Sequence, residues 1–181
     1  MDRRELIQWL VATAGLRCLE SLAPADLLAL GRDVHRGAGG DRPLLALTAH
    51  AERTVAAAAE RIIPATDTPG TTAAGVTAFI DKMLADWHTP AERDHFLAGL
   101  RDLDARCRAR ASHDFVACAE ADQVAVLNEL DAEAAPVRDH WFGRLKYLTV
   151  YGYCTSEAGM RALGLFPLPW RYDGCAPVTT R

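Results

Sequence analysis

The sequence predicts an all-α protein: a single-domain bundle of five to seven helices with an extended C-terminal tail that is rich in aromatic residues and proline. The chain has 181 residues, 50% of them hydrophobic and 24% charged, which suffices for one domain with its own core. Apolar residues recur at intervals of three and four along most of the chain, as on one face of a helix. Prolines and capping residues divide this pattern into separate helices.

The N-terminal segment, residues 1–35, fits two interpretations that the sequence leaves open. Arg3 and Arg4 precede a moderately apolar stretch, which is similar to a twin-arginine export signal. The part from Pro24 to Val34 also has the pattern of an amphipathic helix packed on the bundle, with proline at its first position and an aspartate in its first turn. We predict that the helical domain covers residues 44–181.

The first predicted helix of this domain follows Thr48, whose hydroxyl can cap it. It ends before Pro64, because the residue that precedes a proline avoids helical torsions. The next helix begins at Val76, and its apolar residues fall on one stripe: Val76, Phe79, Ile80, Met83, Leu84 and Trp87.

Residues 89–92 have the sequence of a capping box, in which Thr89 and Glu92 bind each other's backbone amides. The helix that starts there carries Cys107 on its apolar stripe, so we interpret this cysteine as a small core residue. A further helix is predicted over residues 121–135 from the spacing of its apolar side chains, Val124, Leu127 and Leu130.

The last predicted helix, starting near Pro136, is apolar around most of its circumference. One stripe holds Val137, Trp141, Leu145 and Leu148, and aromatic rings occupy the other sides at Phe142, Tyr147, Tyr151 and Tyr153. Such a helix must be covered on most sides, either as the central helix of the bundle or in part by another protein. The tail carries Trp170 and Tyr172, so we expect it to lie on an apolar surface of this bundle or of a partner.

Signatures of cofactor binding and catalysis are largely missing. The sequence has no G-x-G-x-x-G, Walker loop, C-x-x-C, G-x-S-x-G or H-E-x-x-H. His88, Glu92 and His95 could share a helical face as metal ligands, but the proline at position 90 interrupts it, and polar residues at a helix start are the favoured interpretation. A net charge of −4 and the lack of a long apolar run argue against nucleic-acid binding and a transmembrane helix. We expect no catalytic, cofactor or metal site on this chain.

Two segments are more specific than the rest. IIPATDTPGTTAAGVTAFIDKML, residues 62–84, joins two predicted helices by a turn, and GYCTSEAG, residues 152–159, precedes the aromatic tail with its YDGC sequence. In this order they resemble the gluconate 2-dehydrogenase subunit 3 family, over roughly residues 47–177.

The resemblance implies a noncatalytic small subunit that escorts and stabilises a large flavin-dependent dehydrogenase of the glucose-methanol-choline type. Such complexes are exported by bacteria and oxidise sugars or sugar acids. FAD is then expected on the large subunit, and haem c on a cytochrome c that takes the electrons. The twin-arginine signal would export both chains, which implies a periplasmic location.

We expect the partner-interface candidates to lie in the turn, in the GYCTSEAG element and among the aromatic residues. Each of these positions also has a purely structural interpretation, as a turn, a helix cap or a core ring. The candidates are Pro64, Asp67, Pro69, Gly70, Trp141, Tyr147, Tyr151, Tyr153, Ser156, Glu157, Trp170 and Tyr172.

The five cysteines permit disulfides if the chain is exported. Cys154 and Cys175 flank the tail and are the first candidate pair, and Cys107 with Cys118 is the local alternative. At least one thiol stays free or pairs with another chain, because the number is odd.

Two other functions stay open. The chain could be an enzyme in its own right, with His140, Tyr151 or Glu157 as acid or base in a pocket of the bundle. It could also be a cytoplasmic helical binding domain.

Overall fold

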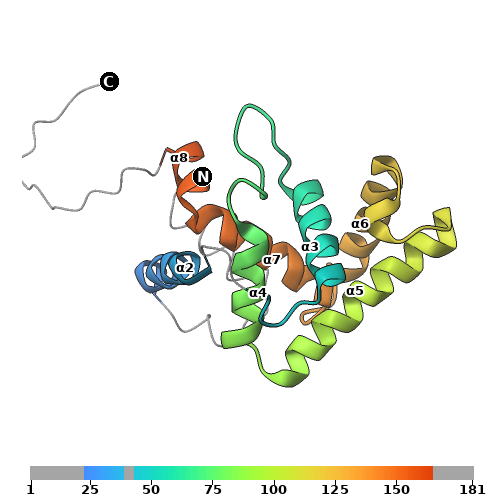
Figure 1. Cartoon of the computed structure of the whole chain (residues 1–181), viewed down its shortest axis with the longest axis horizontal. Coiled ribbons are helices and arrows are strands. Elements are labelled where there is room, and N and C mark those ends of the chain that lie inside the picture. The colour runs from blue at the N-terminus through green and yellow to red at the C-terminus, as the bar shows by residue number, and fades with distance from the viewer. Residues whose placement is uncertain (1–22, 39–42, 165–181) are drawn as a thin grey trace, which may run out of the picture.

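Helix α7 (Trp141–Thr155) lies at the centre of the structure, and the other helices pack around it (Figure 1). The computed structural model describes residues 23–38 and 43–164. In chain order, the other elements are α2 (Pro24–Ala38), α3 (Ala49–Ile62), α4 (Val76–Asp86), α5 (Pro90–Ala111), the 3-10 helix η1 (Phe115–Ala117), α6 (Glu120–Ala134) and α8 (Glu157–Ala162). The described part thus has seven α-helices and no strand, and the all-α prediction is confirmed. The predicted tail lies outside it.

Of the two ways to cover its apolar circumference that the sequence left open, helix α7 takes the first and is the central helix of the bundle. It contacts all six other α-helices, and eleven of its fifteen residues are buried. Gly99 of α5 lies so close to Trp141 that a Cβ there would overlap the indole ring. Gly152 faces Phe79 of α4 in the same way. Close approach at these glycines lets α4 and α5 pack directly on α7.

The two predicted helix starts are confirmed by their caps. The Thr48 hydroxyl accepts the amide of Ala51 at 3.2 Å. The Thr89 hydroxyl accepts the amide of Glu92 at 3.3 Å, and the Glu92 carboxylate accepts the amide of Thr89 at 2.9 Å, which completes the capping box. Each side chain satisfies an amide that has no partner within the helix.

Two predicted boundaries were wrong. Helix α7 begins at Trp141 and not near Pro136, because residues 136–139 form turns and the His140 ring accepts the amide of Phe142 at 3.2 Å. Val137 is therefore half exposed, outside the apolar stripe. Helix α4 ends at Asp86, so Trp87 follows it as the cap residue and its side chain is 47% exposed.

Helix α2 belongs to the bundle, where it packs on α4 and α7. The Tyr151 hydroxyl donates to the carbonyl of Leu27 at 2.7 Å, and the ring of His35 stacks on Phe79 at 4.7 Å between centroids. The helical interpretation therefore holds for the described end of the N-terminal segment. Residues 1–22, which carry the twin-arginine pattern, lie outside the described residues.

Candidate partner-binding site

The two sequence segments that carry the family resemblance meet in space. Residues 63–75 connect α3 to α4 as a loop, the α3–α4 loop, which rises out of the bundle (Figure 1). At its base, the Tyr153 hydroxyl at the end of α7 donates to the carbonyl of Pro69 at 2.8 Å. This contact spans 84 residues of sequence and joins the IIPATDTPG turn to the GYCTSEAG element. We therefore treat this junction as the candidate site.

The Glu60 carboxylate organises the loop from the last turn of α3. One oxygen accepts the amide of Ala65 at 3.0 Å. The other accepts the hydroxyls of Thr71 and Thr72 at 2.8 and 2.9 Å and the amide of Thr72 at 3.1 Å. A single side chain thus holds the two ends of the loop, at Ala65 and at Thr71 and Thr72. The spacing of residues in the sequence does not predict this role of Glu60.

The charged form of Glu60 is the one that these contacts favour. Partial burial would raise its pKa, but the hydrogen bonds from Thr71, Thr72 and Ala65 outweigh burial and lower the pKa from its ordinary value. The loop backbone also passes so close to the carboxylate that a Cβ on Gly70 would overlap it and would lie 2.6 Å from the Ala65 nitrogen. Glycine at position 70 is thus required by the close approach.

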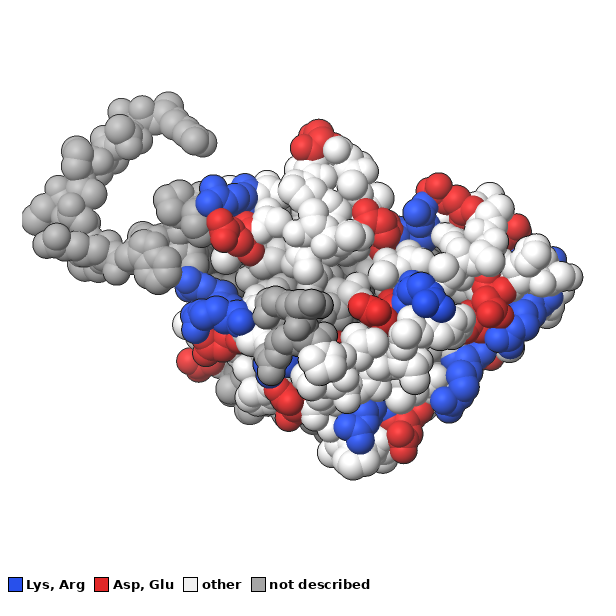
Figure 2. All heavy atoms as spheres, viewed as in Figure 1, with Lys and Arg blue, Asp and Glu red and all other residues white. Residues whose placement is uncertain are grey.

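The apex of the loop faces solvent. Thr66 and Asp67 are exposed there, and the side chains of Pro64, Ala65 and Pro69, which flank the apex, are exposed as well. Asp67 is the only charged residue between Ile63 and Gly75, and Figure 2 shows acidic side-chain atoms at the tip of this loop.

The α7–α8 corner lies beside the base of the loop. The Ser156 hydroxyl donates to the carbonyl of Tyr153 at 2.7 Å and accepts the amide of Gly159 at 2.9 Å, so it caps α8 as predicted. Ser156 is buried, whereas Glu157 is exposed and pairs with Arg161 at 2.7 Å. Of these residues, only Glu157 and Arg161 expose charged side chains to solvent.

The aromatic candidates on α7 fill the core. Trp141, Tyr147, Tyr151 and Tyr153 are 3–6% exposed. The Tyr151 ring packs against Tyr147 and Phe79, and the Trp141 ring packs against Phe142. In this structure these four side chains lie in the core of the bundle, beneath its surface. Trp170 and Tyr172 lie outside the described residues, so their predicted contacts stay predictions.

The residues considered for an enzyme are not brought together. The His140 ring caps the start of α7, and the buried Tyr151 hydroxyl donates to the backbone carbonyl of Leu27. Burial raises the pKa of Tyr151 above its ordinary value, with a smaller contribution from Tyr147. Glu157 follows the other end of α7, a helix of 15 residues that is roughly 22 Å long.

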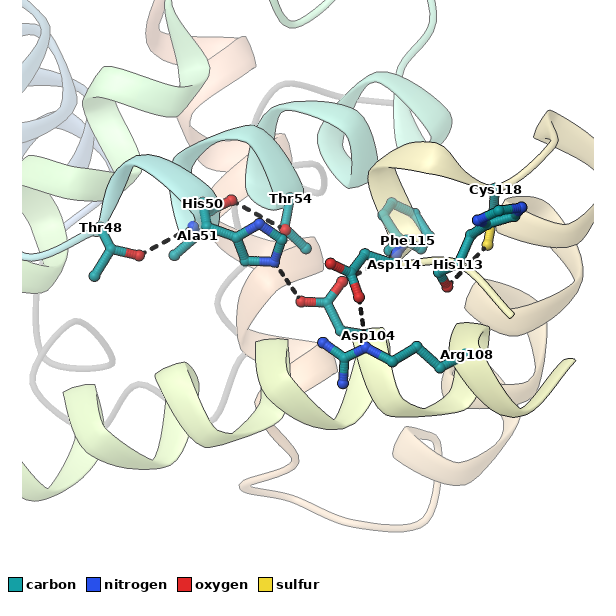
Figure 3. Close-up of polar contacts among 10 residues, drawn as sticks. All are labelled: Thr48, His50, Ala51, Thr54, Asp104, Arg108, His113, Asp114, Phe115 and Cys118. Atoms are coloured by element: carbon teal, nitrogen blue, oxygen red, sulfur yellow. Dashed lines mark hydrogen bonds and ion pairs between the residues drawn. The ribbon is translucent and has the colours of Figure 1, made fainter. Parts of the chain in front are cut away.

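One histidine–carboxylate pair has no signal in the sequence (Figure 3). His50 on α3 donates from Nε2 to the Asp104 carboxylate on α5 at 2.7 Å, and the other Asp104 oxygen accepts the amide of Phe115 at 3.0 Å. The Asp104 side chain is 4% exposed and that of His50 44%. The hydroxyl of Thr54 donates to the His50 carbonyl within α3, so this donor is not directed at the His50–Asp104 pair. The pair connects α3, α5 and η1. Its two residues are 54 positions apart, and local spacing does not predict a contact over that separation.

A surface cavity of about 180 Å³ opens between α3, α6 and α7. This volume is below the ~300–1,000 Å³ of usual small-molecule sites. Its rim carries the Lys146–Asp131 ion pair at 2.7 Å. The lining residues are Arg61, Ile62, Val124, Leu127, Asn128, Asp131, Phe142 and Lys146.

Two of the three residues considered as metal ligands, His88 and Glu92, make other contacts. His88 is buried and donates from Nδ1 to the carbonyl of Met83 at 2.9 Å. Glu92 is committed to the capping box and lies 3.4 Å from Arg144. Within residues 23–38 and 43–164, no group of three or more His, Cys, Asp or Glu residues is placed to hold a metal ion.

The described cysteines are free thiols. Cys107 is fully buried, as predicted for a core residue, and lies beside Cys118. Burial and contact with Cys118 raise the pKa of Cys107 to about 12. Burial raises the pKa of the Cys154 thiol to about 11. Cys175, its predicted disulfide partner, lies outside the described residues.

Comparison with protein families gives one match. The model described as Gluconate 2-dehydrogenase subunit 3 matches residues 49–174, more than half of the chain. This range includes both segments that meet at the candidate site. No curated protein and no solved structure gives a significant match.

Proposed function

Because this chain belongs to the gluconate 2-dehydrogenase subunit 3 family, we propose that it is the noncatalytic small subunit of an exported flavin-dependent sugar or sugar-acid dehydrogenase complex. The large subunit holds FAD and carries out the oxidation, and a cytochrome c with haem c accepts the electrons. The small subunit escorts the large one and stabilises it by binding its folded form.

The family match over residues 49–174 is the observation that carries this proposal. The candidate site agrees with a binding role, because a rigid bundle presents an exposed loop whose base is fixed by hydrogen bonds. The residues considered for catalysis have structural partners instead, as a helix cap, a core phenol and a surface ion pair.

The route of export rests on sequence. Arg3 and Arg4 precede an apolar stretch, and we propose that residues 1–35 direct the complex to the periplasm through the twin-arginine pathway. Among the described residues, no helix combines the length and the apolar character needed to cross a bilayer.

Co-expression tests the escort role. A flavin-dependent dehydrogenase subunit from the same genome is produced with and without this chain, and its solubility, FAD content and periplasmic activity are measured. We expect all three to fall without the chain. Equal solubility, activity and export without it would contradict the proposal.

A separate fusion tests the signal. Green fluorescent protein placed behind residues 1–35 should reach the periplasm, and replacement of Arg3 and Arg4 by Lys should retain it in the cytoplasm. Cytoplasmic retention of the unaltered fusion would favour the cytoplasmic alternative.

A further inference from the structure

The α3–α4 loop combines a fixed shape with an unneutralised charge. The Glu60 carboxylate and the Tyr153 hydroxyl hold its base through five hydrogen bonds. The amide of Thr71 adds a bond to the carbonyl of Ile63 at 3.3 Å. Pro64 and Pro69 restrict the backbone torsions at both ends of the apex. A loop ordered before binding loses less conformational entropy when it binds.

The charge at the apex belongs to Asp67. Its side-chain contact with the described residues is a hydrogen bond from the hydroxyl of the adjacent Thr66 at 2.9 Å. A carboxylate accepts several hydrogen bonds, so most of its acceptor capacity faces solvent. The carboxylate of Glu60, in the last turn of α3, is instead turned toward the loop and bound by four donors.

A protruding apex fits a recess, and a carboxylate at its tip fits a cation. Arginine suits this position best, because its planar guanidinium donates two parallel hydrogen bonds to one carboxylate. The threonine methyl groups and proline rings beside Asp67 offer apolar area around the ion pair.

We propose that the α3–α4 loop docks into a recess of the large subunit that is lined by Arg or Lys, with Asp67 making the ion pair and Glu60 acting as the positioning residue that holds the loop in shape. This inference rests on the proposed function, since it takes the large subunit as the partner. It assigns a role to Glu60 that the family match does not give.

Asp67 variants test the ion pair. The dissociation constant of the complex with the co-expressed flavoprotein subunit is measured at low and high salt. We expect Asp67→Asn to weaken binding about tenfold and Asp67→Arg about a hundredfold, and both to reduce the salt dependence. Asp94→Asn is the matched control, because Asp94 is exposed on α5, away from the loop, and should change binding less than about twofold.

A double-mutant cycle tests the positioning role of Glu60. Glu60→Gln removes one charged acceptor, so it should loosen the loop and weaken binding about fivefold in the native background. In the Asp67→Asn background the same change should have little further effect on binding, yet it should still speed hydrogen exchange at the amides of Ala65 and Thr72. A merely structural contribution would weaken binding equally in both backgrounds.

The outcomes separate this inference from the proposed function. If the unaltered chain forms no complex with the flavoprotein, both fail. If the complex forms and Asp67→Arg binds as the unaltered chain does, the docking inference fails alone. The exposed Asp67 does not hold the fold, so its variants still test the ion pair if Glu60→Gln unfolds.

Discussion

The α5–α6 face and the α3–α4 loop both present charge to solvent, but they satisfy it differently. On α5, Arg106 pairs with Asp102 and binds Glu133 of α6 through two hydrogen bonds at 2.7 and 2.8 Å. Arg110 likewise pairs with Asp122 and Glu129, and Figure 2 shows basic and acidic side chains interspersed along this face. At the loop, the Glu60 carboxylate of α3 points inward, and the Asp67 carboxylate points outward and has no cation partner within residues 23–38 and 43–164. The lesson is that the number of charges on a surface says less about docking than whether each one is already neutralised within the chain.

The largest effect on the free energy of unfolding should come from Asp104, the α5 carboxylate that points into the core. Asp104→Ala leaves the buried amide of Phe115 and the His50 ring without their acceptor. We expect the free energy of unfolding to fall by about 3 kcal/mol in urea denaturation. Asp102→Ala, on the exposed side of the same helix, is the control and should cost well under 1 kcal/mol. Equal losses for the two variants would show that burial does not separate them.

Gly70 should give the next largest effect. Gly70→Ala places a Cβ against the Glu60 carboxylate and the Ala65 nitrogen, so the loop must shift. We expect a loss of about 1–2 kcal/mol in the free energy of unfolding. Gly143→Ala is the matched control, because a Cβ there meets nothing within 4 Å and alanine favours the helix. If Gly70→Ala left the free energy of unfolding unchanged, the α3–α4 loop would adapt freely. It would then not present Asp67 in one fixed shape, as the comparison with the α5–α6 face assumes.

The helices were largely predictable because their signals are local. The caps at Thr48 and Thr89 and the apolar stripe of α4 follow from spacing over a few residues. The turn before Gly70 was also visible in sequence. By contrast, the partners of Glu60 depend on how the loop folds back over the end of α3, and spacing does not encode this.

The same limit applies to the aromatic residues of α7. Sequence showed that Tyr151 and Tyr153 needed cover, and left open whether this bundle or a partner supplied it. The answer depends on long-range packing, since Tyr151 meets Leu27 and Tyr153 meets Pro69 from distant parts of the chain. The His50–Asp104 pair could not be predicted for the same reason, because its residues lie on different helices and 54 positions apart.

Acid should loosen the loop through Glu60. Its pKa lies below the ordinary value of 4.5 in the folded chain, so the contribution of the charged form is complete above about pH 4.5 and is lost as pH falls through the folded pKa. We expect hydrogen-exchange protection at Ala65 and Thr72 to fall in this range. Glu60→Gln should lower protection near neutral pH and remove this pH dependence. A pH dependence that survives in Glu60→Gln would assign it to another carboxylate.

The smallest effect should come from the α5–α6 ion pairs. Arg106→Gln removes a two-bond contact with Glu133 and a pair with Asp102, but all three side chains are well hydrated, and such pairs contribute less than about 1 kcal/mol. Thermal unfolding at low and high salt measures this, and the difference between variant and unaltered chain should shrink as salt screens the pairs. The variant should bind the flavoprotein subunit as the unaltered chain does, because these charges are neutralised within the chain. If Arg106→Gln weakened binding as much as Asp67→Asn, the α5–α6 face would belong to the interface, and neutralisation within the chain would no longer distinguish the two surfaces.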